Sequence, residues 1–204
     1  QKLLNANKPE GKIAESALTG LLSHLNEGLP SRSFSRDSKE DEVIKNLFLL
    51  TDKPMIYVAN VDDHSMESAE ITSAREMAKN NQSSFVVING KLEAEMADFD
   101  EDEKIIILED YNLKETGLNT LIKEAYNTLG LQTFFTCGEI EVRGWTIKKN
   151  DTAVDAAAEI HTDFATKFIK AEIYTYKDAL QHQDNVKELK TLGLVKNVGR
   201  DYIM

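Results

Sequence analysis

The segment Lys53-Pro54-Met55-Ile56-Tyr57-Val58-Ala59-Asn60-Val61-Asp62-Asp63 is the most informative stretch of this 204-residue chain. Its short apolar run, which begins after a proline, predicts a buried parallel strand over residues 54–59. The strand is followed by Asn60 and, three residues later, by Asp63. In open α/β sheets, ligands bind beyond the carboxyl ends of the strands, where an amide and a carboxylate can grip the edge of a purine. The segment therefore predicts a nucleotide-binding α/β fold.

A second apolar run, residues 84–88, predicts a strand parallel to the first. The helical pattern over residues 67–80 joins the two strands as one right-handed crossover unit. Asn89 and Gly90 form a loop at the end of the second strand, so two adjacent loops can surround a base. Asn and Asp also collect at strand ends because they suit turns and helix caps, which is the competing interpretation.

The remaining pattern predicts two kinds of structure on either side of residue 130. Before it lie helices, and after it a β-hairpin, a short helix and further short strands, an α+β roll that resembles the β-grasp arrangement. The helices are expected over residues 11–27, 38–50, 92–96, 104–113, 117–129, 153–160 and 186–192, and the strands over 131–147 (hairpin), 168–176 and 202–203.

Composition restricts the class of protein. The net charge is −11, and residues 1–129 carry 14 basic against 24 acidic side chains, whereas residues 130–204 carry 10 against 11. The acidic part should repel nucleic acid, while the nearly neutral part could contact RNA through a local patch. No apolar run reaches the roughly 18 residues that a membrane helix needs. The single cysteine, Cys137, suits a reducing compartment, and the scattered histidines form no metal-binding pattern.

Three other motifs have ordinary structural interpretations. The acidic run 98–103 is typical of a capped, solvated helix start rather than of a metal site. His161-Thr162-Asp163 has no evident Ser or Cys partner, which favours a structural loop over a catalytic arrangement. Trp145 lies in an alternating strand, which favours a core position over a platform for stacking bases.

The segments 129–139, 141–147, 156–157, 160–164 and 168–172 closely resemble the carboxyl-terminal part of the YchF family of Obg-like ATPases. They begin with Leu-Gly-Leu-Gln-Thr-Phe-Phe-Thr-Cys-Gly-Glu, followed by Glu-Val-Arg-Gly-Trp-Thr-Ile. The segment 53–63 resembles the last base-reading strand of the same family, and Leu92-Glu93-Ala94-Glu95 resembles its next helix. The resemblance covers nearly the whole chain.

This resemblance implies a P-loop-type nucleotide-binding domain with an inserted helical coiled-coil arm, followed by a TGS domain of β-grasp fold. Residues 1–30 would belong to the arm, 31–129 to the later part of the nucleotide domain, and 130–204 to the TGS domain without its final strand. Family members are cytoplasmic, prefer ATP to GTP, hydrolyse it slowly with Mg²⁺ and bind ribosomes. We therefore expect a purine nucleotide and ribosomal RNA as partners, and neither DNA nor membrane.

The chain departs from the family pattern in its motifs. It has no Gly-x-x-x-x-Gly-Lys-Ser/Thr sequence, and no Asp-x-x-Gly follows a strand. We therefore expect a fragment whose phosphate loop and Mg²⁺ ligands lie upstream of Gln1. The fragment itself should hold no catalytic residue and no metal ligand, and should not hydrolyse nucleotide.

The resemblance also assigns roles around the base. Val61 would pack against the purine in place of a lysine stem, Asn60 would hold the base and its loop, and Asp63 would probe the base edge. Asn89 and Gly90 would cover the other side. Because ATP-preferring members usually carry Glu where Asp63 stands, we expect weaker discrimination between ATP and GTP. The alternatives are a non-catalytic RNA- or protein-binding module that acts through its TGS region, and another TGS-bearing protein such as a synthetase or a stringent-response enzyme.

Overall fold

The computed structural model describes residues 9–62, 68–138, 141–183 and 185–204. The chain forms two compact units, Gln1–Thr128 and Leu129–Met204. The division falls one residue before the boundary at 129/130 that the sequence predicts. No helix among the described residues is both long and apolar enough to span a membrane.

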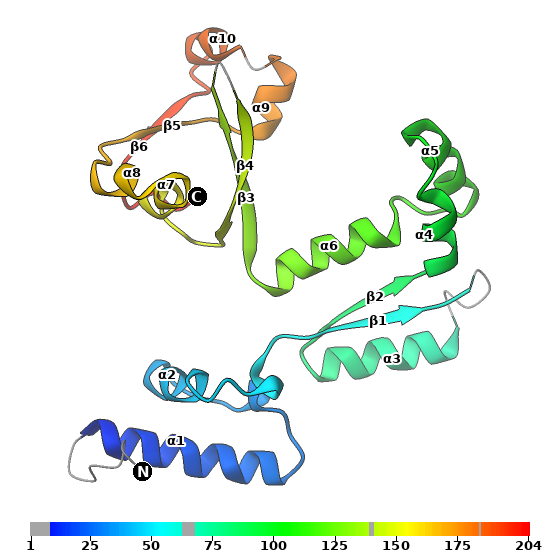
Figure 1. Cartoon of the computed structure of the whole chain (residues 1–204), viewed down its shortest axis with the longest axis vertical. Helices are drawn as coiled ribbons and strands as arrows, with labels where there is room; N and C mark the ends of the chain where they lie inside the picture. Colours follow the sequence, from blue (N-terminus) through cyan, green and yellow to red (C-terminus); the bar gives the residue numbers. More distant parts are fainter. Residues whose placement is uncertain (1–8, 63–67, 139–140, 184) are drawn as a thin grey trace. The chain divides into compact units, whose positions relative to one another are not determined.

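The first unit combines helices with a two-stranded parallel sheet (Figure 1). Its elements are α1 (Pro9–Asn26), η1 (Ser31–Ser33), α2 (Ser38–Lys45), η2 (Leu50–Asp52), β1 (Ile56–Asn60), α3 (Ala69–Asn80), β2 (Ser84–Ile88), α4 (Gly90–Met96), α5 (Glu101–Asp110) and α6 (Gly117–Thr128).

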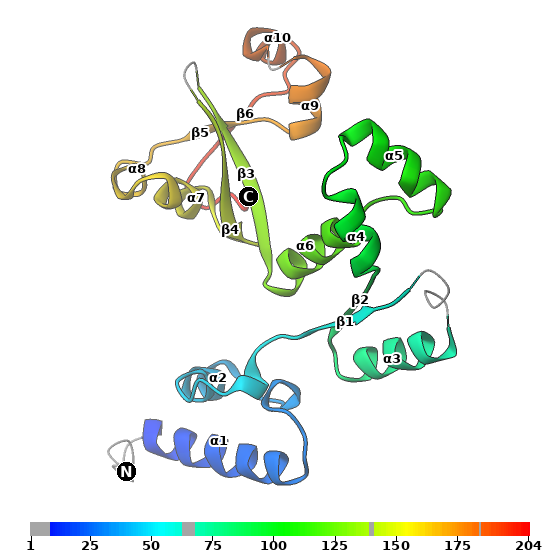
Figure 2. The same ribbon diagram turned by 45° about the vertical axis from the view of Figure 1, so that its right-hand side comes forward.

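The parallel strands β1 and β2 form the centre of this unit. Their register pairs Ile56 with Ser84 and Asn60 with Ile88, so both strands end side by side. Helices α3 and α6 both contact β2 and lie on opposite sides of the strand pair in Figures 1 and 2. Val86 on β2 is 2% exposed, because helices cover both faces of this strand. The predicted strand–helix–strand crossover is confirmed.

Helices α1 and α2 pack against each other. Ala17 and Ile44 are fully buried in this contact region. An ionic cluster then joins η1 to η2. Arg36 Nη1 donates to Asp52 Oδ1 at 2.7 Å, and the hydroxyl of buried Ser31 donates to the same oxygen at 2.9 Å. The hydrogen bond to Asp52 raises the pKa of Arg36 above its usual value.

The second unit is built on an antiparallel hairpin. Its elements are β3 (Leu131–Cys137), β4 (Val142–Lys148), α7 (Ala153–Ile160), α8 (Thr162–Thr166), β5 (Ala171–Ile173), α9 (Tyr176–Gln181), α10 (Val186–Thr191) and β6 (Lys196–Val198). Helix α7 covers one face of β4, where Ile147, Ala153 and Ala156 are buried. A second antiparallel pair, β5–β6, completes the described sheet structure of this unit.

Several sequence expectations need correction. The helix expected over 38–50 ends at Lys45, because Phe48 adopts φ +52°, a conformation outside the right-handed helix. The strand expected over 168–176 shrinks to Ala171–Ile173, because the side chain of Thr175 caps α9 and turns the chain. The strand β6 was not predicted. The segment expected to continue as a strand at 202–203 contributes an isolated bridge between Thr152 and Ile203.

Candidate base-binding site

The ends of β1 and β2 are joined by a side chain. Asn60 Oδ1 accepts a hydrogen bond of 2.9 Å from the backbone N–H of Gly90. A Cβ atom on Gly90 would lie 3.0 Å from the same oxygen and 3.4 Å from Nδ2, so the close approach requires glycine or a displaced amide. Within the part of the chain that the structure describes, no partner is recorded for Asn60 Nδ2, and the side chain is exposed. Asn60 thus holds the second loop through its oxygen, while no described residue accepts from its amide nitrogen.

Asn89 has a different environment from Asn60, although both follow strands. Its side chain is 5% exposed, and its Oδ1 accepts from the backbone N–H of Leu92 at 3.1 Å. Asn89 is therefore the N-cap of α4, which begins at Gly90 rather than after a loop through residue 91 as the sequence suggested. Gly90 is the part of this turn that lies against Asn60.

Val61 extends the strand pairing by one residue. Its backbone N–H donates to Ile88 O at 2.9 Å, and its side chain is half-buried beside the two strand ends. The next residue, Asp62, is exposed and takes part in an interaction with another group. Asp63 lies outside the described residues. The structure thus brings Asn60, Val61 and Gly90 together at one edge of the sheet, with Asn89 directly behind them.

The sequence did not predict the hydrogen bond that links α4 to α6. Glu93 Oε1 accepts a hydrogen bond of 2.6 Å from the backbone N–H of Gly117, the first residue of α6. A Cβ on Gly117 would lie 3.0 Å from Ile88 Cγ2 and 3.1 Å from Glu93 Oε1. A glycine at the start of a predicted helix, rather than after its end, was the one available signal of this close contact.

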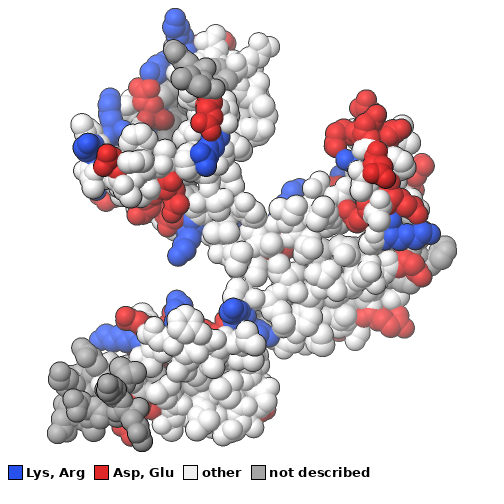
Figure 3. All heavy atoms as spheres, viewed as in Figure 1, with Lys and Arg blue, Asp and Glu red and all other residues white. Residues whose placement is uncertain are grey.

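The surface around α5 is strongly acidic (Figure 3). The acidic run is confirmed as a capped helix start. The side chain of Asp100 accepts from the backbone N–H of Glu103, and the side chain of Glu103 accepts from the backbone N–H of Asp100. No group of three or more potential metal ligands occurs among the residues that the structure describes. The described residues therefore offer groups that could hold a base but no cluster suited to Mg²⁺.

The other two motifs have structural roles in the second unit. His161 Nδ1 accepts from the backbone N–H of Asp163 at 3.1 Å and so caps α8, as the structural interpretation predicted. Trp145 is half-buried rather than fully buried. Its indole N–H donates to Thr136 Oγ1 at 2.9 Å, and the Arg143 guanidinium lies 4.2 Å from its ring centroid.

Comparison with known proteins places these features in one family. Residues 131–204 match the family model YchF-GTPase_C, described as "Protein of unknown function (DUF933)". The "Ribosome-binding ATPase YchF" of Buchnera aphidicola subsp. Schizaphis graminum is 36% identical over 202 residues, which cover 99% of this chain and 56% of that protein. The protein of the same name from Bacillus subtilis is 37% identical over 192 residues, which cover 90% of this chain and 52% of that protein.

Among solved structures, that of the Schizosaccharomyces pombe YchF GTPase matches with a TM-score of 0.84 and 29% sequence identity. The match covers 98% of this chain and 55% of the yeast chain. This chain therefore spans about half the length of the relatives that it matches, and the similarity extends over both of its units.

Proposed function

Because the chain belongs to the YchF family, we propose that it forms the base-binding part and the adjoining carboxyl-terminal part of a ribosome-associated ATPase. The observation that carries this proposal is the hydrogen bond between Asn60 Oδ1 and Gly90 N. It links the two strand ends where ligands of α/β sheets bind. The relatives whose names include ribosome binding and ATPase activity align with this chain over both units.

In the proposed complex, a purine lies over the end of β1. Asn60 Nδ2 donates to an acceptor nitrogen of the purine, because its oxygen is already occupied by Gly90. Val61 packs against the ring, Asp63 receives N–H groups from its edge, and the Asn89–Gly90 turn closes the other side. An ionised Asp favours guanine, which has two adjacent N–H donors, over adenine, which presents a lone pair there. We propose that the site accepts both ATP and GTP.

Residues 1–204 provide no phosphate loop. The sequence lacks Gly-x-x-x-x-Gly-Lys-Ser/Thr, and the described residues include no metal-ligand cluster. Hydrolysis with Mg²⁺ of the YchF type requires a phosphate loop, which this sequence lacks, and metal-binding groups that the described residues do not supply. We propose that the 204-residue chain binds nucleotide through the base alone and releases no phosphate.

For the second unit we propose a TGS domain of β-grasp type that contributes to ribosome binding. The support is the family-model match over residues 131–204 and the order of elements, in which a hairpin and a packed helix precede a second antiparallel pair. The length of helix α1, Pro9–Asn26, supports the assignment of residues 1–30 to part of a helical arm. A ribosome-associated protein of this type would act in the cytoplasm.

Isothermal titration of the 204-residue chain with ATP, GTP and CTP tests the base site. We expect both purine nucleotides to bind more tightly than CTP, and Asn60→Ala to abolish the difference. Equal binding of all three nucleotides, or steady phosphate release by the pure chain, would contradict the proposal. Asn46→Ala is a suitable control, because the Asn46 side chain also makes one hydrogen bond to the main chain, donating to Glu42 O, but lies at the carboxyl end of α2.

A second candidate is a module that binds RNA without using nucleotide. The observation in its favour is the large exposed aromatic area of the second unit, where Phe135 and Tyr176 are 55% and 63% exposed. Cosedimentation with ribosomes separates the two candidates. Ribosome binding that changes on addition of ATP and is altered by Asn60→Ala supports the nucleotide-dependent ATPase. Ribosome binding that is unaffected by ATP and by Asn60→Ala supports the RNA-binding module.

A further inference from the structure

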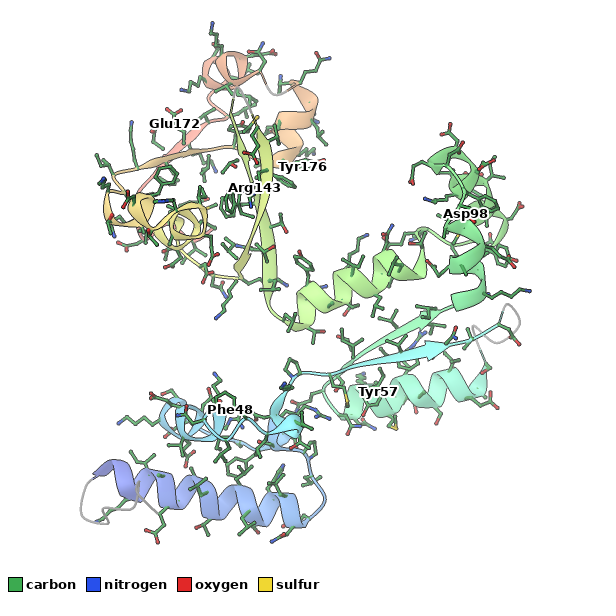
Figure 4. All side chains as sticks on the ribbon, viewed as in Figure 1. Phe48, Tyr57, Asp98, Arg143, Glu172 and Tyr176 are labelled. Carbon is green, nitrogen blue, oxygen red and sulfur yellow. The ribbon has the colours of Figure 1, made fainter. Side chains whose placement is uncertain are left out.

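The outer face of the β3–β4 hairpin carries an exposed aromatic pair. Phe135 on β3 and Tyr176 at the start of α9 have ring centroids 5.5 Å apart and an interplanar angle of 28°. Their exposed fractions are 55% and 63%, so more than half of each side chain is open to solvent. We call this pair the aromatic shelf; Tyr176 is labelled in Figure 4.

The strand register shows which residues share the face of the shelf. Phe135 pairs with Gly144, so its cross-strand neighbour has no side chain to cover the ring. Alternation places Arg143 and Trp145 on the opposite face, together with buried Ile147, which packs toward α7. The shelf therefore belongs to the side of the hairpin that is not used for the core of the unit.

Charge on this face favours a polyanion. The eight strand positions that share it include one charged side chain, and it is basic. They are Leu131, Thr133, Phe135, Cys137, Val142, Gly144, Thr146 and Lys148. Lys177 follows Tyr176 directly and is exposed. The lack of carboxylates at the strand positions contrasts with the acidic first unit, which would repel a phosphate backbone. Beyond the strands, the carboxylate of Asp178 follows Lys177 and accepts from the Thr175 hydroxyl.

We propose that the aromatic shelf binds single-stranded RNA by stacking bases on Phe135 and Tyr176, with Lys148 contacting the backbone. Sequence-tolerant single-strand binding combines aromatic platforms with basic side chains, and the offset arrangement of the two rings leaves an outer ring face open for a base. The identification of the strand as ribosomal RNA rests on the proposed ribosome-associated function.

Fluorescence anisotropy at low ionic strength, with a labelled oligouridylate about 12 nucleotides long, tests the shelf. This probe contains no purine and so avoids the base site of the first unit. We expect Phe135→Ala, Phe135→Leu and Tyr176→Ala each to weaken binding about tenfold, and Tyr176→Phe to have no effect. Phe135→Leu keeps apolar bulk without an aromatic face, so it separates stacking from loss of folding.

Phe164 supplies a matched control, because it is also 55% exposed and lies in the same unit on α8. Phe164→Ala should leave RNA binding unchanged. Lys148→Gln should reduce the slope of log affinity against log salt by about 0.7, the value for one phosphate contact of a single strand. The proposal is overturned if the wild-type chain does not bind the probe, if Phe135→Leu binds normally, or if Phe164→Ala weakens binding equally.

Ribosome cosedimentation of the same variants separates this proposal from the proposed function. If Phe135→Leu cosediments as well as wild type, the shelf is not the ribosomal contact although ribosome association stands. If cosedimentation is lost while oligouridylate binding is unchanged, the shelf contacts protein and the RNA proposal is wrong. If the wild type fails to cosediment yet binds oligouridylate through Phe135, the shelf stands as an RNA site and the proposed function fails.

Discussion

Asn60 and Gly90, thirty residues apart in sequence, are joined by a 2.9 Å hydrogen bond from the backbone of one to the side chain of the other. This bond holds the loop after β1 against the turn after β2. It also determines which atoms of Asn60 remain for a ligand, because the oxygen is used while no described residue accepts from the amide nitrogen.

Replacing Asn60 with Ala should weaken purine binding and lower the free energy of unfolding by about 1 kcal/mol, the net value of one hydrogen bond. Urea denaturation followed by circular dichroism measures the stability change, and titration with ATP measures the binding. Asn60→Asp is informative beside it, because a carboxylate can still accept from Gly90 but cannot donate to a base. We expect Asn60→Asp to retain stability and lose affinity; unchanged affinity would remove Nδ2 from the proposed contact.

Replacing Gly90 with Ala should displace the Asn60 amide. The added Cβ would lie 3.0 Å from Asn60 Oδ1, so the side chain has to move by a few tenths of an ångström. We expect purine affinity to fall about threefold to tenfold, equivalent to roughly 0.6–1.4 kcal/mol. Gly28→Ala is not a suitable control, because Gly28 has φ +79°. Gly138→Ala is better, since its nearest neighbour would lie 3.6 Å away.

Replacing Asp52 with Ala should destabilise the protein by about 2 kcal/mol, because it leaves Arg36 Nη1 and the Ser31 hydroxyl without their shared acceptor, while Arg36 Nε keeps its bond to Asp41. Glu101→Gln is the matched control. Its partner Lys104 lies 2.8 Å away, similar to the 2.7 Å of the Arg36–Asp52 pair, but the Glu101 side chain is 88% exposed. Exposed ion pairs contribute about 0–1 kcal/mol, so chemical denaturation should separate the two variants clearly.

Acid should weaken the first unit partly through Asp41. Its hydrogen bond with Lys45 lowers the pKa of this carboxyl below its usual range, and the neighbouring Arg36 acts in the same direction. A group whose pKa is lower in the folded state adds stability above its unfolded pKa of about 3.9, and this contribution is lost as the pH falls through the lower folded value. The unfolding free energy of Asp41→Asn should therefore depend less on pH below about 4. Parallel curves for wild type and variant would contradict this expectation.

Replacing Asp63 with Glu should shift nucleotide preference toward ATP. The prediction follows from sequence, since adenine lacks the N–H donors that a close carboxylate receives from guanine. Competition of ATP and GTP for the 204-residue chain and for its Asp63→Glu variant measures the ratio of affinities. A ratio that does not respond to the substitution would show that this carboxylate does not face the base edge.

Much of the first unit could be predicted from local pattern. The apolar runs that became β1 and β2, the helix between them and the two polar strand ends all follow from hydrophobic periodicity and from residues that suit turns. The hairpin β3–β4 was equally clear, because both strands alternate around turn residues. The prediction of secondary structure failed where a strand pattern and a helix-cap residue occurred in the same segment. Residues 168–176 alternate like a strand, but the cap at Thr175 starts a helix.

The residue types alone determined that polar groups follow two parallel strands and that residues 1–204 contain no phosphate loop. Only the tertiary structure decided that Asn60 bonds to Gly90 while Asn89 is buried as a helix cap, although both are asparagines at strand ends. It likewise paired Phe135 with Tyr176 on the outer face of the second unit. The physical reason is that alternation and capping, the Asn89 cap included, are set by neighbours within a few residues. The Asn60–Gly90 and Phe135–Tyr176 contacts instead join segments about 30 to 40 residues apart, whose meeting depends on how whole strands and helices pack.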